Sequence, residues 1–384
     1  MEGTRQEQVS REAQEMRELL DSPAKMRALD PHAMYKSIAE LPAQVSEAWE
    51  IAQGTELPQT GGTLPRSVII SGMGGSAIGG DLLRALVEDR VPVPVLVNRD
   101  YSLPAFAGPD DLVIVSSYSG NTEETLSVYD EAKRRGSRVV AVTSGGELAR
   151  RAAVDGYPVV RIPGGLMPRA ALGYSFIPLY NLFYRMGLAV GGDLGAEGGV
   201  RQSEGEIRIR RLRAALEKWR DRWGLERPVA ENRAKQLALA VRGKLLVVYG
   251  SQGWKGTVAY RWKGQFNENG KNFAHTNVFP ELNHNETVGW ENPPELVQKT
   301  TCVILWDEAD NPRNAKRVAV TAQILRERGV QVEEVWAEGE SELERMFSLI
   351  YLGDWTSLYL AYLNGVDPYP IAVIDRLKAA MAAE

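Results

Sequence analysis

The stretch Leu112-Val113-Ile114-Val115-Ser116-Ser117-Tyr118-Ser119-Gly120-Asn121-Thr122-Glu123-Glu124-Thr125 joins an apolar run to a charged one through a loop of hydroxyl residues and glycine. The apolar run is typical of a buried strand, and the charged residues begin an amphipathic helix. A helix start presents unpaired N–H groups and the positive end of its dipole, which favours an anion such as a phosphate. The same residue types also cap an ordinary helix, with Ser119 or Asn121 as the N-cap.

Short apolar runs alternate with helical patterns on both sides of this stretch. The first series predicts strands at residues 67–71, 95–98, 112–117, 138–143 and 158–162. The second predicts strands at residues 244–249, 300–306 and 331–336. Alternation at this spacing indicates βαβ units, so we expect an α/β fold of two doubly wound, mostly parallel sheets with helices at both ends of the chain.

The pattern divides the chain into four parts. Residues 1–55 form a helical arm, with one helix ending near Leu20 and another that has Asp30 as N-cap and Pro31 at its first position. Residues 56–190 form the first sheet domain, and residues 191–228 a glycine-rich linker followed by a charged helix. Residues 229–384 form the second sheet domain, which ends in two helices.

The composition of the chain limits the kinds of partner that we expect it to bind. The 384 residues carry a net charge of −5, with 45 basic and 50 acidic residues mixed along the chain. We therefore expect no nucleic acid and no anionic membrane surface as partner, but a small molecule or a copy of the chain. One cysteine, Cys302 in an apolar run, excludes an internal disulfide and is expected in a buried strand. The polar N-terminus and the lack of a long apolar stretch predict a cytoplasmic location.

A second glycine loop follows the first predicted strand. Its sequence is Ser71-Gly72-Met73-Gly74-Gly75-Ser76-Ala77-Ile78-Gly79-Gly80-Asp81, which nearly fits the dinucleotide fingerprint, and Asp100 could bind a ribose. Loops at the carboxyl ends of neighbouring strands converge on one crevice in an open sheet. Both loops are thus expected to face a single ligand, and the Ser-rich loop already offers a phosphate cradle without a nucleotide.

Together with three downstream motifs, these loops resemble a known family. The loops resemble the sugar isomerase (SIS) domain, and the further motifs are Pro168-Arg169-Ala170-Ala171-Leu172-Gly173-Tyr174, Phe266-Asn267-Glu268-Asn269 and Pro280-Glu281-Leu282-Asn283-His284-Asn285-Glu286. In this order they look like the bifunctional phosphoglucose/phosphomannose isomerase family from about residue 66 to the C-terminus. The resemblance implies two SIS domains, a homodimer whose active site draws on both chains, and no cofactor or metal.

The resemblance also implies roles for single residues in an aldose–ketose isomerisation through an enediol. Its implied phosphate-binding residues are Gly75, Ser76, Ser117, Ser119 and Thr122. Glu268 would be the base, His284 the ring-opening residue, Arg169 the cation for the enediolate oxygen, and Lys378 a further catalytic residue. Family members that accept both epimers have a small hydroxyl residue shortly before this lysine. Residues 367–372 lack one, which leaves activity on mannose 6-phosphate open beside glucose 6-phosphate.

Each catalytic candidate also has a plainer structural explanation. Glu268 could be a surface carboxylate at a helix end, and His284 a structural histidine. Arg169 could form a surface ion pair, and Lys378 could simply favour the end of a helix. Of the other histidines, His32 is expected on the surface of a first helical turn and His275 in a loop.

Two other functions fit parts of the sequence. A non-catalytic sugar-phosphate-binding SIS protein would keep the loops and need no base, but a regulator of this kind carries a DNA-binding helix-turn-helix, for which the two N-terminal helices lack a basic surface. A dinucleotide-dependent oxidoreductase would rest on the first glycine loop alone. The sequence therefore favours the isomerase.

Overall fold

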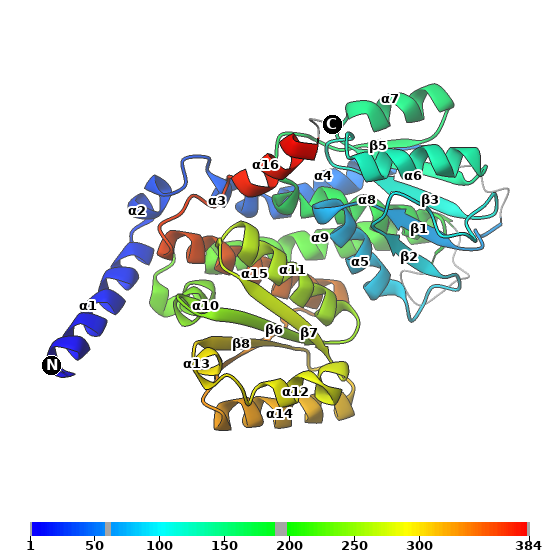
Figure 1. Ribbon diagram of the computed structural model, residues 1–384. Coiled ribbons are helices and arrows are strands. Elements are labelled where there is room, and N and C mark those ends of the chain that lie inside the picture. The colour runs from blue at the N-terminus through cyan, green and yellow to red at the C-terminus, as the bar shows by residue number, and fades with distance from the viewer. Residues whose placement is uncertain (1, 58–62, 189–197, 382–384) are drawn as a thin grey trace. The chain divides into compact units, whose positions relative to one another are not determined.

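The computed structural model of the chain describes residues 2–57, 63–188 and 198–381 (Figure 1). The chain forms two compact units. One consists of Glu40–Leu216, and the other of Met1–Ala39 together with Glu217–Glu384. Each unit contains one parallel sheet, which confirms the predicted α/β class. Among the described residues, no helix has both the length and the apolar character needed to cross a bilayer.

The sheet of the unit Glu40–Leu216 has five strands in the order β2-β1-β3-β4-β5. Every neighbouring pair is parallel, and in register Val68 lies opposite Leu112 on β3 and Val95 on β2. The strands are β1 (Val68–Ser71), β2 (Val95–Asn98), β3 (Leu112–Ser116), β4 (Arg138–Thr143) and β5 (Val159–Arg161). The chain leaves β1 toward β2 and later continues from β3 toward β4, so the strand order reverses between β1 and β3.

Helices cover both faces of this sheet. One face carries α5 (Gly74–Val87), on which α8 (Leu172–Arg185) packs, and α4 (Leu41–Gln53) packs on α8 in turn. The other face carries α6 (Glu123–Arg134) and α7 (Gly146–Asp155), whose Val128, Tyr129, Leu148 and Ala152 lie in one buried cluster with side chains of β1, β3 and β4. Continuous apolar strands such as Leu112–Ser116 are expected where helices bury both faces of a sheet. Helix α9 (Gly198–Trp223) follows and reaches into the second unit.

The second sheet has four parallel strands in the order β7-β6-β8-β9. They are β6 (Leu245–Ser251), β7 (Ala274–Phe279), β8 (Thr300–Trp306) and β9 (Gln331–Trp336). Its strand order also reverses once, between β6 and β8, so the two sheets repeat one topology. Cys302 is buried in β8, as predicted.

Helices again lie on both sides of the second sheet. Three helices contact the sheet or one another, namely α10 (Arg233–Val241), α11 (Trp254–Glu268) and α15 (Glu342–Leu363). Helix α14 (Pro312–Glu327) buries Val318, Ala322 and Leu325 in a cluster with side chains of β6, β7 and β8. The remaining helices of the unit are α1 (Glu2–Leu20), α2 (Pro23–Ala28), α3 (Met34–Ala39), α12 (Glu286–Gly289), α13 (Pro294–Gln298) and α16 (Ala372–Met381).

The N-terminal segment differs from the expected pair of helices. Helix α1 ends at Leu20 as predicted, but three helices follow in place of one. The Asp30 carboxylate does accept hydrogen bonds at a helix start, from the N–H groups of Met34 and Tyr35 at 2.8 and 2.9 Å. The helix starts at Met34 and not at Pro31, because Ala33 has a φ of 53°, which no α-helix accommodates.

The structure also divides the arm and adds a strand. Residues 1–39 belong to the unit of the second sheet, whereas α4 lies in the unit of the first. Strand β7 was missed, because its sequence Ala-His-Thr-Asn-Val-Phe is too polar for an apolar run. Residues 191–197 of the predicted glycine-rich linker lie outside the described residues, and Gly198 already begins α9.

Candidate functional site

The predicted phosphate-binding residues lie at the reversal point of the first sheet. Gly75 and Ser76 lie in the first turn of α5, directly after the short loop that follows β1, and the loop after β3 runs from Ser117 to Thr122. Strands β1 and β3 are neighbours in the sheet, so both loops leave it at the same edge. In doubly wound sheets this is the position where ligands bind.

The loop between β3 and α6 is closed by its own hydroxyl groups. Ser117 Oγ lies 3.0 Å from Thr122 Oγ1, and the N–H of Gly120 donates to Ser117 Oγ over 3.2 Å. The N-cap of α6 is Thr122 and not Ser119 or Asn121, and the Thr122 side chain makes no capping hydrogen bond. The hydroxyl groups therefore shape the loop instead of being used to cap the helix.

Ser76, in the first turn of α5, binds the loop after β3. Its Oγ accepts a hydrogen bond of 3.1 Å from the N–H of Tyr118, and the residue is only 6% exposed. A Cβ atom on Gly75 would lie 2.7 Å from the carbonyl oxygen of Pro168, so glycine is needed for the close approach of α5 to the 3₁₀ turn Pro168–Ala170. Arg169 lies in this turn and is 4% exposed, so the surface ion pair considered from the sequence is wrong.

A third loop, residues 144–145 between β4 and α7, supports the phosphate loop together with the start of α7 and was missed by the sequence analysis. The N–H of Glu147 donates to Asn121 Oδ1 over 2.9 Å. Gly120 has a φ of 72°, and a Cβ atom there would lie 1.9 Å from the carbonyl oxygen of Gly145. The signal for this loop was its Ser-Gly-Gly sequence at the end of a predicted strand.

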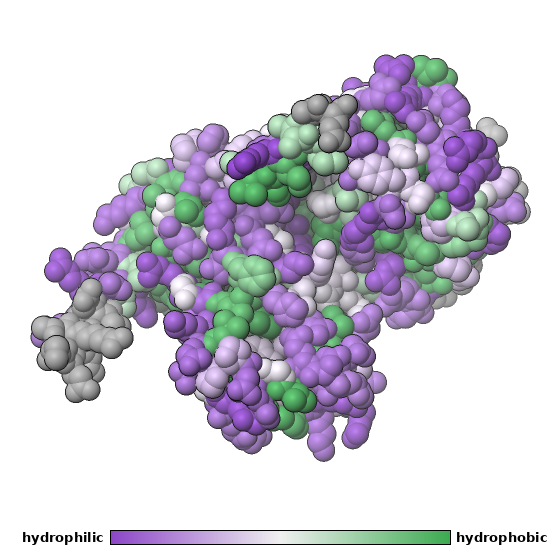
Figure 2. Space-filling model, viewed as in Figure 1, coloured by the Kyte–Doolittle hydropathy of each residue, from purple (hydrophilic) through white to green (hydrophobic). Residues whose placement is uncertain are grey.

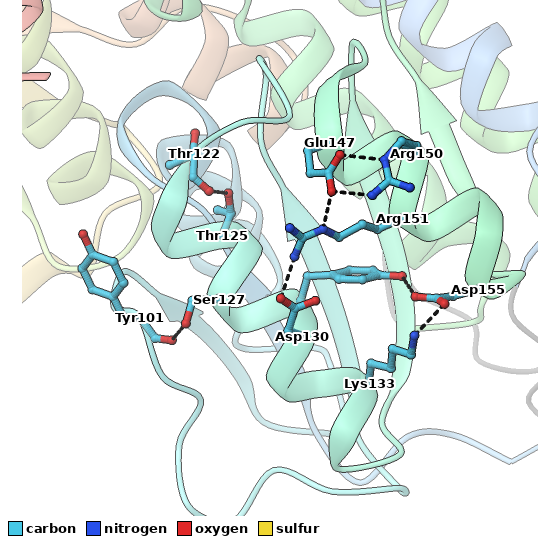
Figure 3. Close-up of polar contacts among 11 residues, drawn as sticks. Tyr101, Thr122, Thr125, Ser127, Asp130, Lys133, Glu147, Arg150, Arg151 and Asp155 are labelled. Carbon is cyan, nitrogen blue, oxygen red and sulfur yellow. Dashed lines mark hydrogen bonds and ion pairs between the residues drawn. The ribbon is translucent and has the colours of Figure 1, made fainter. Parts of the chain in front are cut away.

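An ion-pair network joins α6 to α7 beside this loop (Figure 3). Arg151 lies 2.8 Å from the Glu147 carboxylate and 2.6 Å from that of Asp130, and Arg150 lies 2.6 Å from Glu147. The hydrogen bonds from Arg150 and Arg151 lower the pKa of Glu147 from 4.5 to about 2. Hydrogen bonds at the other end of the two helices join Tyr129, Lys133 and Asp155. The network fixes α6, whose first turn follows the phosphate loop.

In the second unit, Glu268 is the last residue of α11 and is half-buried. The neighbouring asparagines hold this helix end on both sides. Asn267 Oδ1 accepts from the N–H of Ala274 at the start of β7 over 3.0 Å, and Asn269 Nδ2 donates to Ser357 Oγ on α15 over 3.0 Å. The motif Asn-Glu-Asn thus fixes the position of the Glu268 backbone on two elements.

Lys271 links Glu268 to the segment before the last helix. Its Nζ donates to the carbonyl oxygens of Glu268 and Pro368, at 2.5 and 3.3 Å. Its φ is 50°, a left-handed conformation that is rare for lysine. Lys378 lies on α16, where no residue is buried, and is exposed.

Two of the three histidines lie in elements other than those predicted. His32 lies in the turn before α3, not in a helix, and its Nδ1 is 2.8 Å from the Asp367 carboxylate. His275 lies in β7, not in a loop, 3.3 Å from Glu286 Oε2. His284 ends a short 3₁₀ turn, is exposed, and forms no hydrogen bond with any described residue.

The amides beside His284 do not contact its ring. Asn283 Nδ2 donates to Thr321 Oγ1 over 2.8 Å, and Asn285 Oδ1 accepts from the N–H of Glu286 over 2.5 Å. These asparagines fix the backbone of the turn and leave the imidazole open to solvent.

A half-buried polar cluster around Glu286 was not predicted. The Glu286 carboxylate accepts hydrogen bonds from Tyr249 Oη and, over 2.5 Å, from Asn277 Nδ2. Burial raises the pKa of Tyr249, and Trp290 Nε1 donates to its oxygen over 3.0 Å. The cluster adjoins a cavity of about 310 Å³ and anchors α12, the helix after His284. Within the described part of the chain, no three side chains of His, Cys, Asp and Glu are gathered as metal ligands.

Comparison with known proteins identifies the family. Residues 65–157 match the model of the SIS domain, and residues 230–381 match that of the bacterial phospho-glucose isomerase C-terminal SIS domain. The chain is 46% identical over 349 residues to a bifunctional phosphoglucose/phosphomannose isomerase of Caldicellulosiruptor bescii, an alignment that covers 91% of this chain and 99% of the relative. The chain belongs to the bifunctional phosphoglucose/phosphomannose isomerase family.

Further relatives agree with this assignment. The protein of the same name from Aquifex aeolicus is 37% identical over 82% of this chain and 89% of its own length. Among solved structures, a hypothetical protein of Thermus thermophilus superposes with a TM-score of 0.69 at 16% identity, over 98% of this chain and 97% of that one, which shows a shared fold. The predicted family, its two SIS domains and its enzyme class, sugar-phosphate isomerase, are confirmed.

Proposed function

We propose that the chain interconverts glucose 6-phosphate and fructose 6-phosphate by moving a proton between C1 and C2 of the open sugar. The observation that carries the proposal is the 46% identity, over nearly the whole length of both chains, to a protein named for this isomerisation. The hydroxyl-lined loops at the reversal point of the first sheet support a phosphorylated substrate, since they combine a helix start with loop hydroxyls that do not cap it.

The proposed reaction is a proton transfer through an enediol. The Glu268 carboxylate removes the proton from C2 of the aldose, the electron pair of that bond forms the C1–C2 double bond, and the former carbonyl oxygen at C1 gains negative charge and then a proton. The C2 hydroxyl then loses its proton to solvent as the C2 carbonyl forms, and the electron pair of the C1–C2 double bond takes the proton from Glu268 at C1. The fixed position of the Glu268 backbone between two anchored asparagines supports this role.

The other assigned residues serve the same reaction. We assign the phosphate to Ser76, Ser117, Ser119 and Thr122 with the Gly75 backbone, and ring opening to His284. A solvent-open imidazole can exchange a proton with the ring oxygen and with water. Two cations complete the set, Arg169 for the enediolate oxygen and Lys378 as a further catalytic residue. The burial of Arg169 supports its role, since a cation acts more strongly on a developing negative charge where water is excluded.

The principal substrate is proposed to be the glucose isomer. No serine or threonine lies between residues 364 and 378. In this segment Asp367 pairs with His32, and the Tyr369 ring stacks on the His32 ring with centroids 4.7 Å apart, so its backbone is fixed. We therefore expect a lower kcat/KM for mannose 6-phosphate than for glucose 6-phosphate.

The active form is proposed to be a cytoplasmic homodimer. The aromatic stretch 266–290 contributes little exposed surface, because only Phe273 of its four aromatic residues is exposed. Helix α16 offers a better contact surface, since Val373, Leu377 and Met381 are 85%, 62% and 63% exposed. Figure 2 shows this helix as a green patch on a mainly purple surface. Exposed apolar patches of this kind are typical of contact sites between proteins.

A coupled assay tests the proposed function. Fructose 6-phosphate is added without a divalent ion, and the glucose 6-phosphate formed is oxidised by a dehydrogenase that reports it as NADPH. We expect turnover with Michaelis–Menten kinetics. A chain that binds fructose 6-phosphate without forming an aldose would be a sugar-phosphate-binding SIS protein, and the proposal would fall.

A further inference from the structure

The second sheet repeats the topology of the first, and so has an equivalent reversal point. Loops leave it after β6, at residues 252–253, and after β8, at residues 307–311. In the first sheet the corresponding loops are the proposed phosphate site. The second pair of loops therefore has the position of a ligand site, although neither the sequence nor the comparisons assign one there.

The loops after β3 and β8, the equivalent strands of the two sheets, differ in charge. The loop Ser117-Tyr118-Ser119-Gly120-Asn121-Thr122 has hydroxyl groups and no ionisable acid or base apart from a tyrosine. The loop Asp307-Glu308-Ala309-Asp310-Asn311 has three carboxylates in the same position. Such a loop repels a phosphate dianion unless its carboxylates are neutralised.

One of these carboxylates lies between a buried cation and a buried hydroxyl. Asp310 Oδ1 is 3.0 Å from Lys255 Nζ, and both side chains are only 7% exposed. Asp310 Oδ2 accepts a hydrogen bond of 3.1 Å from Ser251 Oγ, at the end of β6. A small anion with oxygen atoms would need these same two donors.

Lys255 has a place in the second unit that is comparable to that of Ser76 in the first. Each residue lies in the first turn of the helix after its first strand, and each reaches to the loop after the neighbouring strand of the sheet. A second cation at this loop, Arg345, lies 2.9 Å from Asp307 Oδ1. Both cations are thus already matched by carboxylates of the loop itself.

We infer that the second SIS domain retains an anion site, which its own Asp310 carboxylate fills in place of the phosphate of a ligand. The Asp310 carboxylate is part of the chain, so its effective concentration at the site is high and a free phosphate does not displace it. The chain therefore binds one sugar phosphate, in its first domain. Removal of the Asp310 carboxylate leaves the Lys255 ammonium buried without a counter-ion, and the vacated site then takes a small tetrahedral oxyanion such as inorganic phosphate.

The test uses variants in which the first loop is silenced by Ser119→Ala and Thr122→Ala. In this parent, Asp310→Ala is compared with the double change Lys255→Met and Asp310→Ala. The thermal midpoint of each is measured in sodium phosphate and in sodium chloride of equal ionic strength. At about ten times the dissociation constant, phosphate should raise the midpoint of the Asp310→Ala protein by about 3 to 5 °C over chloride. The parent and the protein that also lacks Lys255 should show no such difference.

The same midpoint shift in all three proteins would overturn the inference. The absence of a shift in the Asp310→Ala protein would also overturn it. If that protein does not fold in chloride, its refolding yield in phosphate is measured instead, and rescue that requires Lys255 is the expected result. In the unaltered chain, equilibrium dialysis with labelled phosphate should give one equivalent per chain, and two would contradict the inference. None of these readouts uses isomerase activity. The comparison of midpoints is independent of the proposed function, whereas the single equivalent in dialysis rests on the phosphate site proposed for the first domain.

Discussion

At the scale of single residues, the hydroxyls of Ser119 and Thr122 are the simplest test of the phosphate loop. Hydrogen bonds to a charged group contribute about 1.5 to 3 kcal/mol each. Ser119→Ala with Thr122→Ala should thus raise KM by roughly tenfold or more, since about 1.4 kcal/mol corresponds to a factor of ten. Stability should fall by only about 1 kcal/mol, because neither hydroxyl is buried in the core.

Ser127→Ala serves as the matched control for this change. Ser127 lies on α6, and its Oγ donates to the carbonyl oxygen of Tyr101 away from the loop (Figure 3). This variant should keep the KM of the unaltered enzyme. An unchanged KM in the double variant at the loop would show that the phosphate does not bind at this site.

Lys271 is expected to position Glu268 through the backbone. Lys271→Gly keeps the left-handed conformation without strain but loses the ammonium that binds the carbonyl oxygens of Glu268 and Pro368. We expect kcat to fall while KM stays constant, because the phosphate loop is untouched. Lys271→Arg should restore most of kcat, since it can still donate to both carbonyls. Equal kcat values for Lys271→Gly and the unaltered enzyme would show that the contact is irrelevant to catalysis.

At the scale of elements, the network between α6 and α7 predicts a pH dependence of stability. The pKa of Glu147 is about 2 in the folded chain and near 4.5 when unfolded. A carboxyl group whose pKa is lowered by folding stabilises the fold above its unfolded pKa, and this contribution is lost as the pH falls from about 4.5 toward 2. The thermal midpoint should therefore drop over this range, and by less in Glu147→Gln.

Glu56→Gln is the control for the pH experiment. Glu56 is exposed in the same unit and forms no ion pair with a described residue. Its variant should follow the acid curve of the unaltered chain. If Glu147→Gln and Glu56→Gln gave the same curve, the Arg150–Glu147–Arg151 contacts would not persist in solution.

Elements were predicted well where a strand is apolar and poorly where it is polar. Four strand ranges, β2, β4, β8 and β9, match the prediction at both ends. Strand β7 was missed because only its end residues, Ala274 and Phe279, are buried, and the residues between them are mostly polar. One of these is His275, whose partner Glu286 is eleven residues away in sequence. The glycine and hydroxyl loops were predicted because phosphate binding needs residue types that are visible locally. The Asp310–Lys255 pair was not, since it forms only when two strands come together in the sheet.

At the scale of the whole molecule, helix α16 is proposed to contact a second copy of the chain. Val373, Leu377 and Met381 are spaced at four residues and lie on one face of the helix. Val373→Glu should shift the dimer toward monomer in sedimentation velocity, because it places a charge in an apolar contact. Ala379→Glu adds the same charge on the opposite face and should leave the dimer intact. A fully active monomer of the unaltered chain would exclude the proposed dimer.

The most direct test of the account is the fate of the proton during isomerisation in heavy water. Fructose 6-phosphate is incubated with the enzyme in D₂O without a divalent ion, and the product is followed by proton NMR. Transfer by the Glu268 carboxylate through an enediol predicts glucose 6-phosphate that carries deuterium at C2, because the base exchanges its proton with solvent. Glu268→Gln should lose both turnover and label by about 10² to 10⁴-fold, with KM nearly unchanged. Product without deuterium, or a Glu268→Gln enzyme that keeps most of its kcat, would contradict the mechanism.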